Sequence, residues 1–159
     1  MKEIKKSVTI NAPASKIFDY LTDPNNLLEI WPSMIEVSNV KRSPDGSHNF
    51  DFVYKMAGMR FNGHSDTVKV TQNKYVELEN KTGIKSHFKW TYDGRDGATE
   101  ITLQVSYEVP SQLLAKLAEP FLVKINEREA DTLLHNLRER MEATDIGAKP
   151  TGPGKEKRA

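Results

Sequence analysis

Four histidines are the side chains of this sequence that could exchange protons near neutral pH, because the pKa of an unperturbed imidazole lies near 6.5. They are His48, His64, His87 and His135. His48 falls in a predicted turn, His87 alternates with two lysines on the polar face of a predicted strand, and His135 lies among polar positions of a predicted helix. We therefore expect these three to be solvated surface residues.

His64 and Asp66 could act as a pair, since residues two apart on a strand project from the same face of a sheet. Phe61 places odd positions of this strand in the interior, whereas Val68 and Val70 place even positions there, so the strand must contain a β-bulge. If the change of face precedes His64, the pair enters the interior; if it follows, both side chains are exposed. No third ligand stands at a spacing typical of metal sites, so we expect no metal.

Much other chemistry is disfavoured by what the sequence lacks. The chain has no cysteine, which removes thiolate nucleophiles, disulfides and zinc–thiolate sites. It also contains no GxSxG serine motif and no glycine-rich phosphate loop. The formal net charge of +1 creates no field that would attract nucleic acid. These patterns predict no catalytic residue, no cofactor and no nucleic-acid partner.

The hydropathy pattern predicts a soluble protein. No run of about eighteen apolar residues is present, so we expect no integral membrane segment. The polar start of the chain does not resemble a signal peptide, and the absence of cysteine is compatible with a reducing compartment. We therefore expect a cytoplasmic location.

The strongest signal is a set of aromatic residues at alternate strand positions. Each ring can bury about 150–250 Å², and any one of them could simply fill a core. As a group they are typical of a cavity lining, in which the polar groups of Tyr54, Trp90 and Tyr107 could orient a ligand. With three apolar residues of a C-terminal helix, the predicted ligand-binding set is Phe52, Tyr54, Phe61, Phe88, Trp90, Tyr107, Leu117, Phe121 and Ile125.

The elements that must position these residues follow from the period of the hydropathy pattern. Alternation from Ile4 to Ile10 predicts a strand, and Pro13 and Pro24 each open a short amphipathic helix. From residue 34 a period of two continues for about seventy-five residues, broken only by short turns. Connections this short force neighbouring strands to run antiparallel, so a six-strand meander is predicted.

Apolar residues at helical spacing from Leu113 to Met141 predict one long helix, which Pro120 should bend near residues 116–119. The prediction is an α+β helix-grip fold over residues 1–144, with a seven-stranded curved antiparallel sheet wrapped around the C-terminal helix and two short helices after the first strand. Residues 145–159 are rich in glycine, proline and lysine and predict a disordered basic tail.

Several local motifs resemble a known superfamily. They are Ile10-Asn11-Ala12-Pro13-Ala14, Leu21-Thr22-Asp23-Pro24, Trp31-Pro32-Ser33-Met34, Trp90-Thr91-Tyr92 and Gly97-Ala98-Thr99-Glu100-Ile101-Thr102. With the order of elements and the helix after Pro110, they resemble the START-related, birch-pollen-allergen-like (SRPBCC) superfamily, and within it most closely the polyketide cyclase/dehydrase and lipid-transport family. The resemblance implies an apolar cavity that binds lipids, sterols, polyketides or quinones.

The leading functional hypothesis is therefore a carrier or sensor that binds a small hydrophobic ligand inside a cavity. A second is an enzyme of the aromatase/cyclase kind, in which Tyr54, Trp90 and His64 would assist enolisation or dehydration. A third is an adaptor for a protein partner, which would use an exposed surface and leave the cavity closed. The patterns do not specify an oligomeric state.

Overall fold

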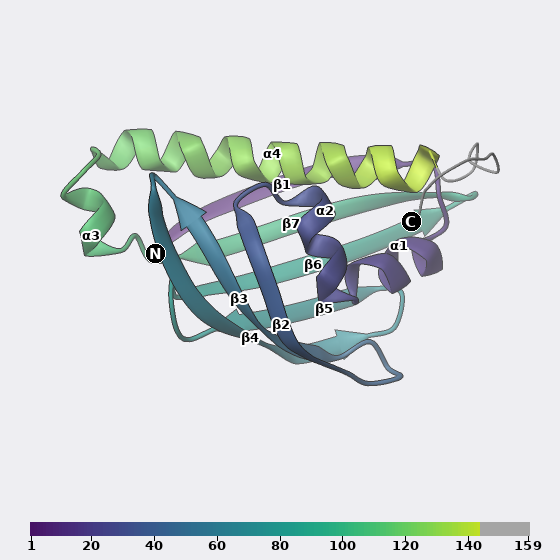
Figure 1. The fold of residues 1–159 in the computed structure, drawn as a ribbon. Coiled ribbons are helices and arrows are strands. Elements are labelled where there is room, and N and C mark those ends of the chain that lie inside the picture. Colours follow the sequence, from purple (N-terminus) through teal and green to yellow (C-terminus); the bar gives the residue numbers. More distant parts are fainter. Residues whose placement is uncertain (144–159) are drawn as a thin grey trace.

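A curved antiparallel sheet packs against the C-terminal helix in the computed structural model, which describes residues 1–143 (Figure 1). The strands are β1 (Lys2–Ile10), β2 (Met34–Arg42), β3 (His48–Met56), β4 (Met59–Thr71), β5 (Tyr75–Asn80), β6 (Ser86–Arg95) and β7 (Ala98–Tyr107). The helical elements are α1 (Ala14–Leu21), the 3-10 turn η1 (Pro24–Asn26), α2 (Leu27–Ile30), α3 (Ser111–Leu114) and α4 (Glu119–Ala143). The predicted helix-grip fold is confirmed, whereas the predicted tail lies outside the described residues.

The order of strands in the sheet is β1-β7-β6-β5-β4-β3-β2. Strands β2 to β7 therefore form the predicted meander, and β1 completes the sheet beside β7. Every neighbouring pair is antiparallel, as the short connections require. The twist of so long a meander curves the sheet, and α4 lies along its concave side (Figure 1).

Helix α1 is held against one end of the sheet by Phe18. Its ring meets Tyr92 of β6 edge-on, with 5.4 Å between the ring centroids. The turn between β2 and β3 passes so close to this ring that a Cβ at Gly46 would lie 2.4 Å from it, and Gly46 has a φ of +99°. Glycine has no Cβ to clash with the ring, and it adopts a positive φ without strain. The turn and α1 thus pack as one unit over this end of the sheet.

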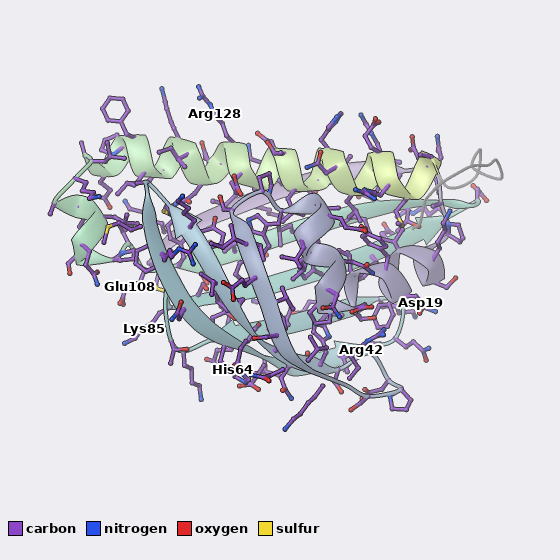
Figure 2. The ribbon with its side chains drawn as sticks, viewed as in Figure 1. Asp19, Arg42, His64, Lys85, Glu108 and Arg128 are labelled. Atoms are coloured by element: carbon purple, nitrogen blue, oxygen red, sulfur yellow. The ribbon has the colours of Figure 1, made fainter. Side chains whose placement is uncertain are left out.

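The pairing of β4 decides the position of His64. The register shifts between Thr67 and Lys69, so the β-bulge lies after His64. Phe61 and Ser65 are buried on the concave face, while His64 lies on the outer face opposite Asp51 of β3. Of the two alternatives, the structure shows the one in which His64 and Asp66 point away from the interior, and Figure 2 shows His64 on the outer side of the sheet.

The predicted single bent C-terminal helix is wrong in one respect, because the chain forms two helices. Helix α3 ends at Leu114 and α4 begins at Glu119, with residues 115–118 between them. Pro120 lies in the first turn of α4, where its missing N–H has no intrahelical partner to lose. In the interior of a longer helix the same proline would remove a backbone hydrogen bond and crowd the preceding turn. Pro120 therefore fits the start of α4 and would not fit the interior of one helix that continued from α3.

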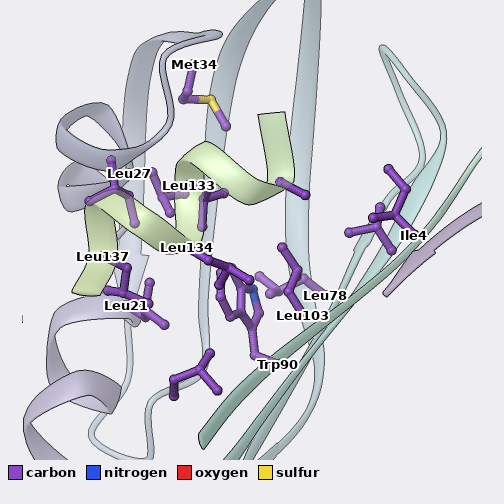
Figure 3. Close-up of a cluster of buried hydrophobic side chains, with 14 of the residues drawn as sticks. Ile4, Leu21, Leu27, Met34, Leu78, Trp90, Leu103, Leu133, Leu134 and Leu137 are labelled. Atoms are coloured by element: carbon purple, nitrogen blue, oxygen red, sulfur yellow. The ribbon is translucent and has the colours of Figure 1, made fainter. Parts of the chain in front are cut away.

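Leucines of α4 join the sheet in a single core (Figure 3). Leu133, Leu134 and Leu137 are at most 3% exposed and pack in the same cluster as Trp90 and Leu103 of the sheet. Burial of this apolar area, at about 25 cal/mol per Å², is the main term that holds α4 in place. No helix within residues 1–143 is long and apolar enough to cross a membrane.

Candidate functional site

A cavity of about 110 Å³ lies between α4 and the concave face of the sheet. A single water needs roughly 10–15 Å³ of such space, so the cavity has room for a small organic molecule. Most of its wall is apolar, and much of that wall is aromatic. The aromatic residues of the sheet that line the cavity are Phe50, Phe52, Tyr54, Phe88, Trp90, Tyr92 and Tyr107.

Five of the nine residues predicted to bind a ligand line this cavity. They are Phe52, Tyr54, Phe88, Trp90 and Tyr107. Phe61 is buried beside Tyr54 on the neighbouring strand but does not reach the cavity wall. Leu117 lies in the link between α3 and α4, where it packs against the core at its edge.

The prediction that Phe121 and Ile125 face the sheet is wrong. Their side chains are 64% and 39% exposed. The buried residues of α4 are instead Leu122, Asn126, Ala130, Leu133, Leu134, Leu137 and Met141. The break before Pro120 resets the rotation of the helix, so the apolar stripe that precedes the break does not continue through Phe121 and Ile125.

The prediction that His48 is a solvated turn residue is also wrong. His48 is the first residue of β3, is 6% exposed and lines the cavity. Its ring stacks on Phe50, and its Nδ1 lies 2.9 Å from the carbonyl oxygen of Gly46. A carbonyl only accepts, so Nδ1 carries the proton and Nε2 carries the lone pair. The sequence does contain a signal for this placement, because His48 has the same strand parity as Phe50 and Phe52.

His64 cannot serve a reaction in the cavity, because it lies on the opposite face of the sheet. Its Nδ1 donates to Asp51 Oδ1 at 2.6 Å, and its Nε2 lies 3.1 Å from Asp66 Oδ1. With carboxylates on both sides the imidazolium form is favoured. The suggested role of His64 in enolisation is therefore wrong.

The other two histidines lie where the sequence predicts. His87 is on the outer face of β6 and hydrogen-bonds to Glu77, and His135 is exposed on α4. In the part of the chain that the structure describes, no three histidine, aspartate or glutamate side chains are grouped so that they could hold a metal ion.

The pKa of His48 is expected to lie below that of an unperturbed imidazole, and the pKa of His64 above it. Burial lowers the pKa of His48, although its bond to Gly46 partly opposes this effect. The folded protein then binds fewer protons at His48 than the unfolded chain, so its contribution to stability falls as the pH drops below about 6.5. Hydrogen bonding to Asp51 raises the pKa of His64, so its stabilising contribution is present below about 6.5 and is lost as the pH rises through the folded value.

The measurement is an NMR titration of the histidine ring protons, with assignment by His48→Gln and His64→Gln. The expected result is that the His48 signal moves at lower pH than the His64 signal. A His48 ring that titrates at or above the pH of His64 would contradict the buried placement.

A row of four polar side chains crosses the concave face at one level of the sheet. Cross-strand pairing aligns Ser65 of β4 with Asn80, Asn80 with Ser86, and Ser86 with Tyr107. All four residues are buried and line the cavity. We call Ser65, Asn80, Ser86 and Tyr107 the polar row. Sequence reasoning found only Tyr107, since the alignment of the other three residues with it depends on the register of four strands.

Trp31 and Tyr54 form the wall of the cavity next to α2. The Trp31 ring lies 5.5 Å from both Tyr54 and Phe88, centroid to centroid. Burial raises the pKa of Tyr54 well above its usual value, and the nearby Glu129 carboxylate adds to this, while Trp31 and Ser33 act in the opposite direction. Tyr54 is therefore a neutral phenol at physiological pH.

Two polar side chains of α4 hold the helix to the segment that precedes β2. The backbone N–H of Ser33 donates to Glu129 Oε1 at 2.8 Å, and Asn136 Nδ2 donates to the carbonyl of Ile30 at 3.0 Å. Glu129 also lines the cavity and is half-buried. These bonds join α4 to the residues on either side of Trp31, which lines the cavity.

The fold is similar to that of several solved structures. A protein from Thermus thermophilus has a TM-score of 0.76 and 16% identity, covering 90% of this chain and 99% of that one. The Zhui aromatase/cyclase from a Streptomyces species has a TM-score of 0.76 and 16% identity, covering 94% and 99%. A START superfamily protein from Mycobacterium smegmatis has a TM-score of 0.71 and 15% identity, covering 89% and 98%. Identities this low show a shared fold alone.

No curated protein matches this chain. The sequence pattern of the family described as "Polyketide cyclase / dehydrase and lipid transport" matches residues 1–142, almost the whole of the described chain. The matched residues include all seven strands and nearly all of α4, which together enclose the cavity. The chain therefore belongs to the polyketide cyclase/dehydrase and lipid transport family.

Proposed function

We propose that the protein is a carrier or sensor that binds a small, largely apolar molecule in the cavity between α4 and the sheet. The observation that supports this proposal is the cavity itself, with a mostly apolar wall that includes aromatic rings from β3, β6 and β7. A guest that removes its apolar surface from water gains about 25 cal/mol per Å², before the entropy losses of association. Met34 and Met56 on the wall add flexible side chains that can adapt to the guest.

The test is a search for a natural guest. Native mass spectrometry of the protein purified from its own source should show a co-purifying apolar adduct that is lost on denaturation. A panel of small hydrophobic ligands should raise the thermal unfolding temperature, because a ligand that binds the folded state stabilises it. Protein that is consistently bare, together with no thermal shift across the panel, would reject the proposal.

A second candidate function is the aromatase/cyclase type of reaction, and His48 is the observation that favours it. Its Nε2 carries a lone pair on the wall of the cavity, so it could accept a proton from a bound poly-ketone. The test is mass spectrometry of a linear poly-ketone incubated with the protein and with His48→Gln. Ring closure with loss of water only with the wild type would support this function; an unchanged substrate with both would reject it.

A further inference from the structure

We propose that the guest of this cavity carries an uncharged hydroxyl group, as an alcohol, phenol or enol, and that this group binds at the polar row between Asn80 and Tyr107. The inference rests on the proposed binding function and names the class of ligand. Three independent features support it: two polar atoms without a partner, the direction of the hydrogen bonds around them, and the charges of the wall.

The first feature is a pair of unpartnered atoms in the polar row. Among residues 1–143, the buried side-chain atoms without a hydrogen-bond partner are Trp31 Nε1, Asn80 Oδ1 and Tyr107 Oη. Asn80 is 8% exposed and Tyr107 is 5% exposed, and both line the cavity. A buried polar atom left without a partner costs about 1–3 kcal/mol, so these atoms are the places where a polar group of a guest gains most.

Trp31 Nε1 is less informative than the atoms of the polar row. Its indole group favours ionisation of the neighbouring Tyr54 hydroxyl, although the two groups form no hydrogen bond of good geometry. The Trp31 indole N–H therefore already has the Tyr54 hydroxyl as a polar neighbour. The hydroxyl of the guest is therefore assigned to Asn80 and Tyr107.

The second feature is the direction of the hydrogen bonds, which requires the guest to donate. The carbonyl oxygen of Ile84 accepts from Ser86 Oγ at 2.9 Å, which uses the only proton of that hydroxyl. Ser86 Oγ must then accept in its contact with Asn80, so Asn80 donates through Nδ2, also at 2.9 Å. This orientation leaves Asn80 Oδ1 as a pure acceptor. It can be satisfied only by a group that brings a proton.

Tyr107 adds a group that can donate in return. Its hydroxyl belongs to β7, two strands from Asn80 on β5, so the two backbones are about 9–10 Å apart. A hydroxyl donates and accepts at once and can therefore serve both residues. A ketone would accept from Tyr107 and leave Asn80 Oδ1 unpaired, and a hydrocarbon would leave both atoms unpaired.

The third feature is the charge of the wall, which disfavours an anionic head group. No lysine or arginine of the described chain lines the cavity, and its one carboxylate is Glu129. His48 does not replace a cation at neutral pH, because burial lowers its pKa. A carboxylate or phosphate would lose its hydration without gaining a counter-charge. A neutral hydroxyl needs no counter-charge, so the absence of cations does not weaken its binding.

The experiment compares three probes with the same ring system: 2-naphthol, naphthalene and 2-naphthoate. Affinities are measured by titration calorimetry on the full chain near neutral pH. We expect 2-naphthol to bind about tenfold or more tightly than naphthalene, in line with the gain from pairing buried polar atoms. We expect 2-naphthoate to bind more weakly than naphthalene.

Tyr107→Phe locates the hydroxyl. This variant removes an unpartnered buried hydroxyl, so the free protein should be as stable as the wild type or more stable. The preference for 2-naphthol over naphthalene should fall to less than about threefold. Tyr75→Phe is the matched control, because the Tyr75 hydroxyl bonds to Glu77 outside the cavity. It should keep the full preference.

Each outcome decides between the two proposals. The hydroxyl assignment is overturned if 2-naphthol and naphthalene bind equally, or if 2-naphthoate binds more tightly than naphthalene. Either result leaves the cavity as a binding site. A full preference retained in Tyr107→Phe also overturns it, since the hydroxyl would then bind elsewhere. Failure of all three probes to bind counts against the proposed function as well.

Discussion

Replacing Ala130 by phenylalanine is expected to abolish binding in the cavity and leave the protein folded. Ala130 lies on the face of α4 that points to the sheet, is 7% exposed and lines the cavity. A phenyl ring at this position projects into space that a guest would need. Because the ring enters a cavity and not a filled core, the usual overpacking cost of about 1–3 kcal/mol should be largely avoided. Affinity for a bound ligand should fall by more than about tenfold.

Ile125→Phe is the matched control for this prediction. It adds a ring to the same helix, but Ile125 is 39% exposed and lies away from the cavity. Ligand affinity should therefore remain at the wild-type value in calorimetry, and both variants should retain the wild-type circular dichroism spectrum. If Ala130→Phe binds as tightly as the wild type, the ligand site lies outside this cavity. If Ile125→Phe loses binding, the exposed face of α4 takes part in binding after all.

Replacing Leu137 by alanine is expected to lower the free energy of unfolding by about 3–5 kcal/mol, near the upper end for such a change. Leu137 is fully buried in the core between α4 and the sheet and does not line the cavity. Its removal takes away contacts on all sides and leaves a new void. The measurement is chemical denaturation at neutral pH.

Leu133→Ala provides the comparison for Leu137→Ala. Leu133 is 1% exposed but lines the cavity, so one side of it has fewer atoms to contact. The same truncation should therefore cost less, about 2–3 kcal/mol. An equal or larger loss at Leu133 would show that the cavity wall is packed as tightly as the rest of the core.

Most of the sheet could be predicted because alternation is a local property. The run Phe50, Phe52 and Tyr54 predicts a strand with one buried face, and the structure has these three residues on the cavity wall. The same alternation, extended back to His48, places that side chain inside. The local pattern does not show where the turn that contains Gly46 ends, so the predicted turn includes His48, although the strand begins there.

Positions that depend on the meeting of two distant segments could not be predicted in this way. A β-bulge in β4 is evident from the conflict between Phe61 and Val70, yet its place between Thr67 and Lys69 is set by pairing with β5. The rotation of α4 depends on where the helix restarts after Pro120, and this determines that Phe121 points to solvent. One residue of shift in either element moves a side chain to another face.

The amino-acid sequence by itself determined the class of fold, the order of strands β2 to β7 and the concentration of aromatic rings on one face, because these follow from local periodicity and from short connections. Only the tertiary structure decided that His64 lies outside the sheet, that His48 lines the cavity and that Asn80 and Tyr107 share one polar row. Strand register and helix rotation come from contacts between residues far apart in the chain, and no local pattern encodes them.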